Sequence, residues 1–359
     1  MNTESQVIAP LLRGLTFDGD KGAIVVCRDR IDRVELVCGA EELAEKFEPG
    51  MRSVTVEGAG TFLLGEDYDD AVAGTSDASK AGGRAAVVHN KVCVVTGGAQ
   101  GFGEAIAREL IGHGALVFVA DINGGGAKKL AQELNAREGR TVAFGVSVDV
   151  TNEDSVQSMV SEIVETVGGI DLFISNAGVL KAGSVKEQSL EDFAFVTDVN
   201  YIGFFLCTKH VAPVMERMNQ PQGSYFTDII SISSKSALEG SNRNGAYAGS
   251  KFGSVGLVQS FAKELVADNT KVNTICPGNF FDGPLWSDPE NGLFVQYLNT
   301  GKVPGAGTLK DVRRFYESQV PMNRGCNGED VTRAILYAVE QKYETGQAIP
   351  VTGGQVMLN

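Results

Sequence analysis

The segment that most constrains the fold of this chain is an apolar run followed by a glycine-rich turn and an amphipathic stretch. Val92–Val95 is continuously apolar, TGGAQGFG occupies positions 96–103, and Glu104–His113 has the periodicity of a helix. An uninterrupted apolar strand is typical of a parallel sheet covered on both faces. Glycines here let the backbone approach a pyrophosphate, and the helix N-terminus supplies free N–H groups. The sequence therefore predicts a dinucleotide site at this turn.

Predicted strands and helices alternate along the rest of the chain. The expected strands are 116–120, 142–148, 172–175, 229–233, 272–276 and 348–351, and the expected helices include 127–136 and 155–167. Strands that alternate with helices of 10–15 residues indicate βαβ units. The fold class expected for residues 88–359 is therefore α/β, with a Rossmann-type, doubly wound parallel sheet.

The first 70 residues show a different pattern of predicted strands and helices. Short strand-like runs are expected at 22–27, 33–38, 53–56 and 61–64, with a helix at 41–47. They predict a small acidic α/β accessory domain at 1–70. Small and polar residues from 71 to 87 predict a linker between the two domains.

Composition narrows the classes of function. A net charge of −14 argues against nucleic acid or an anionic membrane surface as a partner. The start of the chain lacks the pattern of a signal peptide, and no apolar run is long enough to span a membrane. The six cysteines form no CxxC pair and are expected as free thiols, which favours a cytoplasmic location. The three histidines are not spaced as metal ligands, so no metal site is expected.

Polar residues at the ends of the next strands predict the rest of the cofactor site. Asp121 ends the second large-domain strand, where a carboxylate accepts hydrogen bonds from ribose hydroxyls and repels a 2′-phosphate. NAD is therefore expected rather than NADP. Asp149 and Val150 end the third strand and are expected beside the adenine, while Asn176 and Gly178 end the fourth and are expected to flank the cofactor.

A tyrosine and a lysine four residues apart, Tyr247 and Lys251, predict the reactive centre. This spacing places both side chains on one face of a helix. An ammonium near a phenol favours the phenolate and lowers its pKa from about 10, which would make Tyr247 a general acid/base. Ser234 follows a predicted strand and is placed to hydrogen-bond a substrate carbonyl.

These motifs together resemble the short-chain dehydrogenase/reductase family. The matching pieces are TGGAQGFG (96–103), NAG (176–178), VN (199–200), ISS (232–234), YAGSK (247–251) and PG (277–278). The resemblance implies a catalytic group in which Tyr247 exchanges a proton with the substrate and Ser234 positions it. Lys251 would lower the pKa of Tyr247 and bind the nicotinamide ribose, and Asn200 would hold a water between Lys251 and solvent. It also implies a homodimer or homotetramer.

The resemblance extends the expected cofactor contacts to one set, which is Gly97, Gln100, Gly101, Phe102, Gly103, Asp121, Asp149, Val150, Asn176, Gly178, Tyr247, Lys251, Pro277 and Phe280. One position departs from the family pattern. The residue four places after Gly278 is usually a threonine that touches the nicotinamide amide, and here it is Asp282.

The substrate is predicted less directly. The segments 234–260, 277–286, 320–326 and 345–359 resemble members of the family that oxidise a polyol phosphate to a ketose phosphate. Lys235 and Arg243 are the hypothesised phosphate ligands, with Arg324 as a third possibility. Another sugar alcohol or a 3-oxoacyl substrate is an alternative. A non-catalytic NAD-binding regulatory protein is the alternative from another class.

Two further segments have open interpretations. Residues 52–74 weakly resemble the tail of class II aldolase domains, but residues 1–86 contain no histidine for the aldolase metal site, so a remnant with a structural or oligomerisation role is expected. Trp286, with Leu285 and Phe280, belongs either to a substrate lid or to plain packing. Residues 290–307 are expected to contribute a flexible cover.

Overall fold

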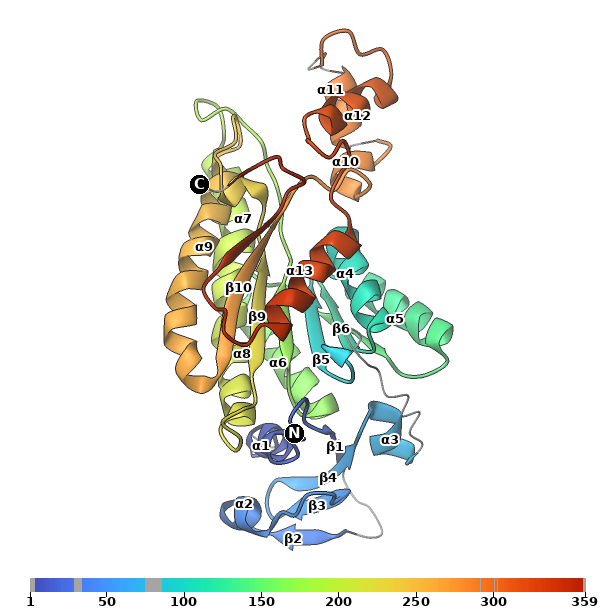
Figure 1. Ribbon diagram of the computed structural model, residues 1–359, viewed down its shortest axis with the longest axis vertical. Helices are drawn as coiled ribbons and strands as arrows, with labels where there is room; N and C mark the ends of the chain where they lie inside the picture. Colours follow the sequence, from blue (N-terminus) through green and yellow to red (C-terminus); the bar gives the residue numbers. More distant parts are fainter. Residues whose placement is uncertain are drawn as a thin grey trace.

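The computed structural model describes residues 4–28, 34–74, 86–290, 292–299, 301 and 303–357. Figure 1 shows three levels along the long axis of the molecule: a small sheet at one end, a large α/β body in the middle, and a group of short helices at the other end.

The body is built on a seven-stranded parallel sheet, which confirms the predicted Rossmann-type fold. Its strand order is β11-β10-β9-β8-β5-β6-β7. The strands are β5 (Val92–Thr96), β6 (Leu116–Asp121), β7 (Ala143–Ser147), β8 (Leu172–Ser175), β9 (Thr227–Ile232), β10 (Thr270–Pro277) and β11 (Ala348–Val351). The direction of winding reverses between β5 and β8. In open α/β sheets a ligand crevice forms at this switch point, outside the carboxyl ends of the strands.

Helices cover both faces of this sheet. They are α4 (Gly101–Gly112), α5 (Gly124–Glu138) and α13 (Gly328–Glu340) on one face, and α6 (Glu153–Val167), α8 (Gly203–Asn219) and α9 (Gly245–Leu265) on the other. The strand β5 shows why both faces are apolar. Val92 and Val94 belong to one hydrophobic core, and Cys93 and Val95 belong to the other, because successive side chains of a strand point to opposite faces.

Local sequence signals set the helix ends, as α6 illustrates. The Asn152 side chain accepts a hydrogen bond from the Ser155 N–H at 2.9 Å, which caps the first turn. Gly168 follows the last turn with φ 88°, a left-handed conformation that favours glycine.

The N-terminal region forms a four-stranded sheet in the order β1-β4-β3-β2. Its elements are α1 (Ser5–Leu15), β1 (Ile24–Arg28), β2 (Leu36–Cys38), the 3-10 turn η1 (Ala40–Glu42), α2 (Leu43–Lys46), β3 (Ser53–Val56), β4 (Gly60–Gly65) and α3 (Tyr68–Ala73). The four expected strands are present. Helix α1 was not predicted, and α3 occupies the first residues of the expected linker, of which 75–85 lie outside the described residues.

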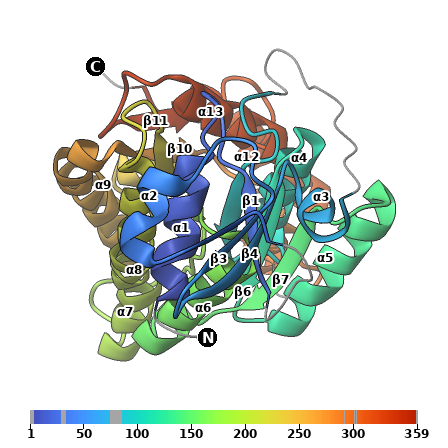
Figure 2. The same cartoon turned by 90° about the horizontal axis from the view of Figure 1, so that it is seen from below.

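This region packs against the body at the amino ends of the parallel strands. Helix α1 lies against α8 and α6, and β1 lies against α6, as Figure 2 shows from below. One continuous hydrophobic core contains residues of both regions. The Arg13 guanidinium, fully buried, pairs with Asp171, which also accepts hydrogen bonds from the Tyr225 hydroxyl and from the Val92 N–H. The N-terminal region is thus joined to the base of the sheet by a buried polar network.

The chain after β10 forms a separate cluster of helices, α10 (Pro284–Ser287), α11 (Leu293–Asn299) and α12 (Leu309–Ser318). Trp286 is buried in its small core, with ring centroids 4.9 Å from Phe281 and 5.0 Å from Tyr316. Trp286 therefore packs within this cluster. The segment expected as a flexible cover contains helix α11 in its described part.

No helix among the described residues has both the length and the apolar character that a membrane span requires. All six cysteines are free, as expected, and four of them are buried.

Candidate active site

The glycine-rich turn has the backbone that its sequence predicts. Gly97 and Gly101 both have φ 61°, in the left-handed region that side chains disfavour. A Cβ on Gly103 would lie 2.1 Å from the Gly97 carbonyl oxygen, so only glycine fits there. The turn leads directly into α4, preceded by Gln100 in an extended conformation. A bare backbone at a helix N-terminus is suited to a dinucleotide pyrophosphate.

Asn176, at the end of β8, braces this turn from the neighbouring strand. Its side-chain amide donates to the Thr96 carbonyl at 2.9 Å and to the Gly97 carbonyl at 3.1 Å. Asn176, which is predicted to contact the cofactor, therefore also stabilises the conformation of the glycine-rich turn.

Asp121 lies at the carboxyl end of β6, next to the same turn. Its two carboxylate oxygens accept hydrogen bonds from the Ala99 N–H at 3.0 Å and from the Asn123 N–H at 2.9 Å. Each oxygen keeps a lone pair for a ribose hydroxyl. In the segment just after β7, the Asp149 carboxylate accepts hydrogen bonds from the backbone N–H and the hydroxyl of Thr151, and Val150 is buried.

The structure brings Ser234, Tyr247 and Lys251 together at the carboxyl edge of the sheet. Ser234 follows β9, and the other two lie on α9. The Lys251 Nζ donates to the Ile232 carbonyl at 2.8 Å and lies 5.8 Å from the centroid of the Tyr247 ring. The Ser234 side chain lies close enough to the Tyr247 phenol to lower its pKa. The predicted i,i+4 juxtaposition is therefore present.

The electrostatics of this group differ from the expectation. Burial raises the pKa of Tyr247, and the nearby Ser234 side chain lowers it by less, so the net direction is upward. Burial also lowers the pKa of Lys251, to about 8. The predicted net fall in the pKa of the phenol is thus wrong for the chain by itself, because desolvation disfavours the charged form of both groups.

Asn200 lies in a π-helical turn, η3 (Asp198–Ile202), between α7 (Leu190–Thr197) and α8. Its amide nitrogen donates to the Val179 carbonyl at 2.9 Å and to the Ser250 hydroxyl at 3.1 Å. A Cβ on Gly178 would lie 3.3 Å from the Asn200 Oδ1 and 3.6 Å from the Lys251 Nζ. Glycine at this position therefore preserves the space between Asn200 and Lys251. That a water lies there stays a prediction.

The loop after Pro277, the last residue of β10, reaches the glycine-rich turn. The Phe280 ring stacks on the Phe102 ring with centroids 4.4 Å apart and an interplanar angle of 19°. A Cβ on Gly101 would lie 3.7 Å from Pro284. Phe102 of the glycine-rich turn and Phe280 of the loop after β10, both predicted to contact the cofactor, are therefore neighbours.

The three cations considered for a substrate phosphate differ in their surroundings. Lys235 directly follows Ser234, is partly buried, and has no ion pair within the described part of the chain. Arg243 is exposed, has φ 56°, and lies 3.6 Å from a Glu187 oxygen. Arg324 bonds both oxygens of Asp330, at 2.5 and 2.9 Å, so it is already engaged.

Two features of the site were not foreseen. The buried thiol of Cys276 lies near Tyr247 and Lys251, and burial raises its pKa to about 11, so the thiol stays neutral at neutral pH. The feature of the sequence that could have identified Cys276 is its position directly before the PG motif at 277–278. Asp282 is paired with Arg313 of α12 at 2.8 Å. The sequence singled out Asp282 because the family usually has a threonine at this position, but it gave no indication that Arg313 would be its partner.

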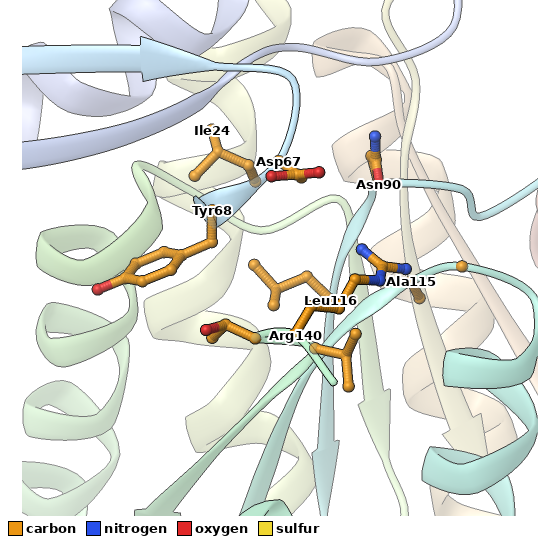
Figure 3. Close-up of a pocket in the computed structure, with 10 residues that line it drawn as sticks. Ile24, Asp67, Tyr68, Asn90, Ala115, Leu116 and Arg140 are labelled. Carbon is orange, nitrogen blue, oxygen red and sulfur yellow. The ribbon is translucent and has the colours of Figure 1, made fainter. Parts of the chain in front are cut away.

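A small pocket of about 10 Å³ lies elsewhere, where the N-terminal region meets the body. Figure 3 shows Asp67, Tyr68, Asn90 and Arg140 around it. It borders the amino ends of β5 and β6, which are five and six residues long. Because a strand rises about 3.3 Å per residue, roughly 16–20 Å separate this pocket from the carboxyl edge. It is distinct from the candidate active site.

No cluster of three or more histidine, cysteine or acidic side chains able to hold a metal ion is found in the described ranges. A glycine-rich turn at the switch point of a parallel sheet, with serine, tyrosine and lysine at the same edge, defines a nicotinamide-dependent dehydrogenase. A family model described as "short chain dehydrogenase" matches residues 91–286, and the chain belongs to this family.

The similar proteins include sorbitol-6-phosphate 2-dehydrogenases and a 3-oxoacyl reductase. The chain is 37% identical to the sorbitol-6-phosphate 2-dehydrogenase of Escherichia coli (strain K12), over 75% of this chain and 99% of that protein. It is also similar to a crystal structure of the sorbitol-6-phosphate 2-dehydrogenase SrlD from Erwinia amylovora, at 37% identity and a TM-score of 0.68, over 74% of this chain and all of that one. It is 30% identical to the 3-oxoacyl-(acyl-carrier-protein) reductase FabG of Thermotoga maritima, over 75% of this chain and 99% of that protein.

Proposed function

We propose that this enzyme interconverts D-sorbitol 6-phosphate and D-fructose 6-phosphate with NAD. The observation that carries the proposal is the 37% identity to a sorbitol-6-phosphate 2-dehydrogenase across 99% of that relative. The C-terminal segments singled out in the sequence, above all VTGGQVM at 351–357, support the same assignment. The proposal also requires a cation for the phosphate, and Lys235 lies beside the catalytic serine.

The chemistry divides between the cofactor and the chain. Bound nicotinamide supplies the acceptor or donor of hydride. For the oxidation of an alcohol, the Tyr247 oxygen takes the hydroxyl proton while the Ser234 hydroxyl hydrogen-bonds the same substrate oxygen. For the reduction of a ketone, the Tyr247 hydroxyl returns the proton. The proximity of the Ser234 side chain to the Tyr247 phenol supports this shared role, because neighbouring groups can contact one substrate oxygen.

Lys251 assists the proton transfer that Tyr247 carries out. Its pKa of about 8 lets it exchange protons near neutral pH, and the Ile232 carbonyl holds its Nζ in place at 2.8 Å. We propose that a water between Asn200 and Lys251, beside Gly178, connects Lys251 with solvent. A cation that moves closer to the phenol, when the nicotinamide ribose binds it, would favour the phenolate during the reaction.

We propose NAD as the cofactor because of Asp121. Its carboxylate is fixed beside the glycine-rich turn by two backbone N–H groups, so it cannot readily turn away from a bound ribose. A fixed negative charge there accepts hydrogen bonds from two ribose hydroxyls and repels a 2′-phosphate.

Lys235 and Arg243 are the proposed phosphate ligands. Replacing Arg243 by alanine should raise the KM for a phosphorylated ketose much more than the KM for its unphosphorylated analogue. Arg243 pairs only loosely with Glu187, at 3.6 Å, so it is available to a phosphate. Arg324→Ala is the matched control, since Asp330 already holds that guanidinium. An equal effect of Arg243→Ala on both substrates would exclude it as a phosphate ligand.

A substrate panel read by NADH absorbance tests the proposed function. The panel contains sorbitol 6-phosphate, free sorbitol, other polyols, and a 3-oxoacyl thioester read in the reducing direction. The thioester is included because of the similarity to FabG. We expect the highest kcat/KM with sorbitol 6-phosphate. Strong turnover of free sorbitol with none of its phosphate would overturn the assignment, and preference for the thioester would favour the second candidate.

We further propose a homodimer or homotetramer in the cytoplasm. Partly exposed apolar side chains gather on α7, η3, α8 and α9, and they are Phe193, Phe195, Ile202, Phe205 and Phe252. Such a face favours burial against another copy. The six free thiols favour a reducing compartment. Light scattering on the purified protein measures the subunit number, and a monomer would contradict this proposal.

A further inference from the structure

The acidic residue that departs from the family pattern has a specific partner. A carboxylate oxygen of Asp282, in the loop after β10, lies 2.8 Å from the Arg313 Nη1 of α12. The Arg313 Nε also donates to Glu317 at 2.7 Å. One ion pair therefore connects the loop at the carboxyl end of β10 with helix α12 of the outermost helix cluster, which Figure 1 shows at the top of the molecule.

The same loop is fixed on its other side by the glycine-rich turn. Phe280 stacks on Phe102, and Pro284 lies next to Gly101. The loop thus stands between the cofactor turn and α12. Asp282 lies at the centre of the few residues between Phe280 and Pro284 that connect the glycine-rich turn with the start of the helix cluster, while the segment after α12 is held to the body separately, where the Cys326 N–H donates to the Asn279 carbonyl at 2.9 Å.

Stability alone does not account for the pair. The Asp282 side chain is 67% exposed and that of Arg313 is 39% exposed, and ion pairs at such positions contribute little to the free energy of unfolding. Helix α12 is already anchored by apolar contacts, since Val312 is buried and Tyr316 packs on Trp286. The ion pair therefore adds little to the attachment of α12.

We propose that Asp282 and Arg313 are positioning residues, which hold α12 in the orientation that completes the substrate side of the site. A productive complex requires the reacting atoms to be held at close range, and small displacements of the enclosing groups reduce the rate. The proposal depends on the dehydrogenase activity of the family and not on which polyol is the substrate.

The charges around Arg313 distinguish this role from direct binding of a substrate phosphate. Arg313 faces two carboxylates, those of Asp282 and Glu317, so the three groups together carry a net negative charge. A phosphate would be repelled by this arrangement. If Arg313 were nonetheless the phosphate ligand, removal of the competing Asp282 charge would strengthen binding of the phosphorylated substrate.

The test uses Asp282→Asn, Arg313→Gln, the double variant, and the conservative Asp282→Glu and Arg313→Lys. Arg314→Gln is the matched control, because Arg314 is an exposed neighbour on the same helix. Steady-state kinetics use the best polyol of the panel, and NADH affinity is measured by fluorescence. We expect an approximately fivefold lower kcat/KM in each neutral variant, which is the most that an ion pair at such exposure supports, no further loss in the double variant, and at least half of the wild-type value in the conservative variants. NADH affinity should change less than twofold, and Arg314→Gln should behave as wild type.

Two outcomes would overturn the proposal: unchanged kcat/KM in both neutral variants, or a lower KM for the phosphorylated polyol in Asp282→Asn. Hydrogen exchange of the α12 peptide in the NADH-bound protein gives a readout that needs no substrate. Exchange should become several-fold faster in Asp282→Asn and Arg313→Gln but not in Arg314→Gln. Unchanged exchange in all three would also overturn it. Failure of the sorbitol 6-phosphate assignment would change only the polyol used, and would leave these comparisons intact.

Discussion

The buried pair between Arg13 and Asp171 gives the sharpest prediction about stability. The two residues are 158 positions apart, and their side chains are 0% and 1% exposed. Arg13 also donates to the Ala23 carbonyl at 2.9 Å. Replacing Arg13 by methionine keeps most of the apolar stem and removes the charge. Asp171 would then be left as a buried carboxylate without its counter-ion.

The expected cost follows from this arrangement. Removing one member of a buried ion pair costs about 3–5 kcal/mol. We expect the lower end, because the Tyr225 hydroxyl and the Val92 N–H still donate to Asp171. At about 2.1 cal/mol/K per residue, the unfolding entropy of 359 residues is about 0.75 kcal/mol/K. A loss of about 3 kcal/mol therefore lowers the Tm by about 4 °C if the chain melts as one unit.

The measurement is equilibrium unfolding in urea, followed by circular dichroism and fluorescence, together with calorimetric melting. Arg333→Met is the control, since Arg333 and its partner Glu329 are 66% and 54% exposed, and its loss should cost less than about 0.5 kcal/mol. Arg13→Met combined with Asp171→Asn should cost less than the sum of the two single changes. Stability of Arg13→Met within about 0.5 kcal/mol of wild type would refute the reasoning.

Three further predictions concern the site and the sheet. Tyr247→Phe should lower kcat by about 10²–10⁴-fold while NADH still binds, as measured by fluorescence titration; unchanged turnover would remove Tyr247 from the proposed mechanism. Asp121→Asn should reduce the preference for NAD over NADP, measured as the ratio of kcat/KM values, and a wild-type preference for NADP would contradict the role given to this carboxylate. Burial raises the pKa of Asp228, beside Lys271, from 3.8 to about 6, so the folded protein keeps this proton to higher pH than the unfolded chain does. The stabilising contribution of this proton is complete below pH 3.8 and is lost as the pH rises through 6. In urea unfolding, the stability advantage of wild type over Asp228→Asn should therefore shrink by roughly 1–3 kcal/mol between pH 4 and pH 7.5. An advantage that grows with pH would contradict the direction of the pKa shift.

The elements that the sequence predicted well are those with a strong local pattern. Strands β8 and β11 begin and end at the predicted residues, because each is a short apolar run between turn residues. Helix α1 was not predicted, and it contains Pro10, a residue that is unfavourable within a helix. Its apolar residues Ile8 and Leu12 are buried in the core that the N-terminal region shares with the body. Tertiary packing, rather than local propensity, stabilises this helix.

The sequence by itself determined the parallel sheet, the glycine-rich turn and the facing of Tyr247 and Lys251. Each of these follows from spacing along a few residues, through the two-residue period of a strand, the sterics of glycine and the turn of a helix. The tertiary structure alone decided that Arg13 reaches Asp171, that Asp282 pairs with Arg313, and that the pKa of Tyr247 rises. These outcomes depend on distances between remote segments and on how much water the packed chain excludes, which no local pattern encodes.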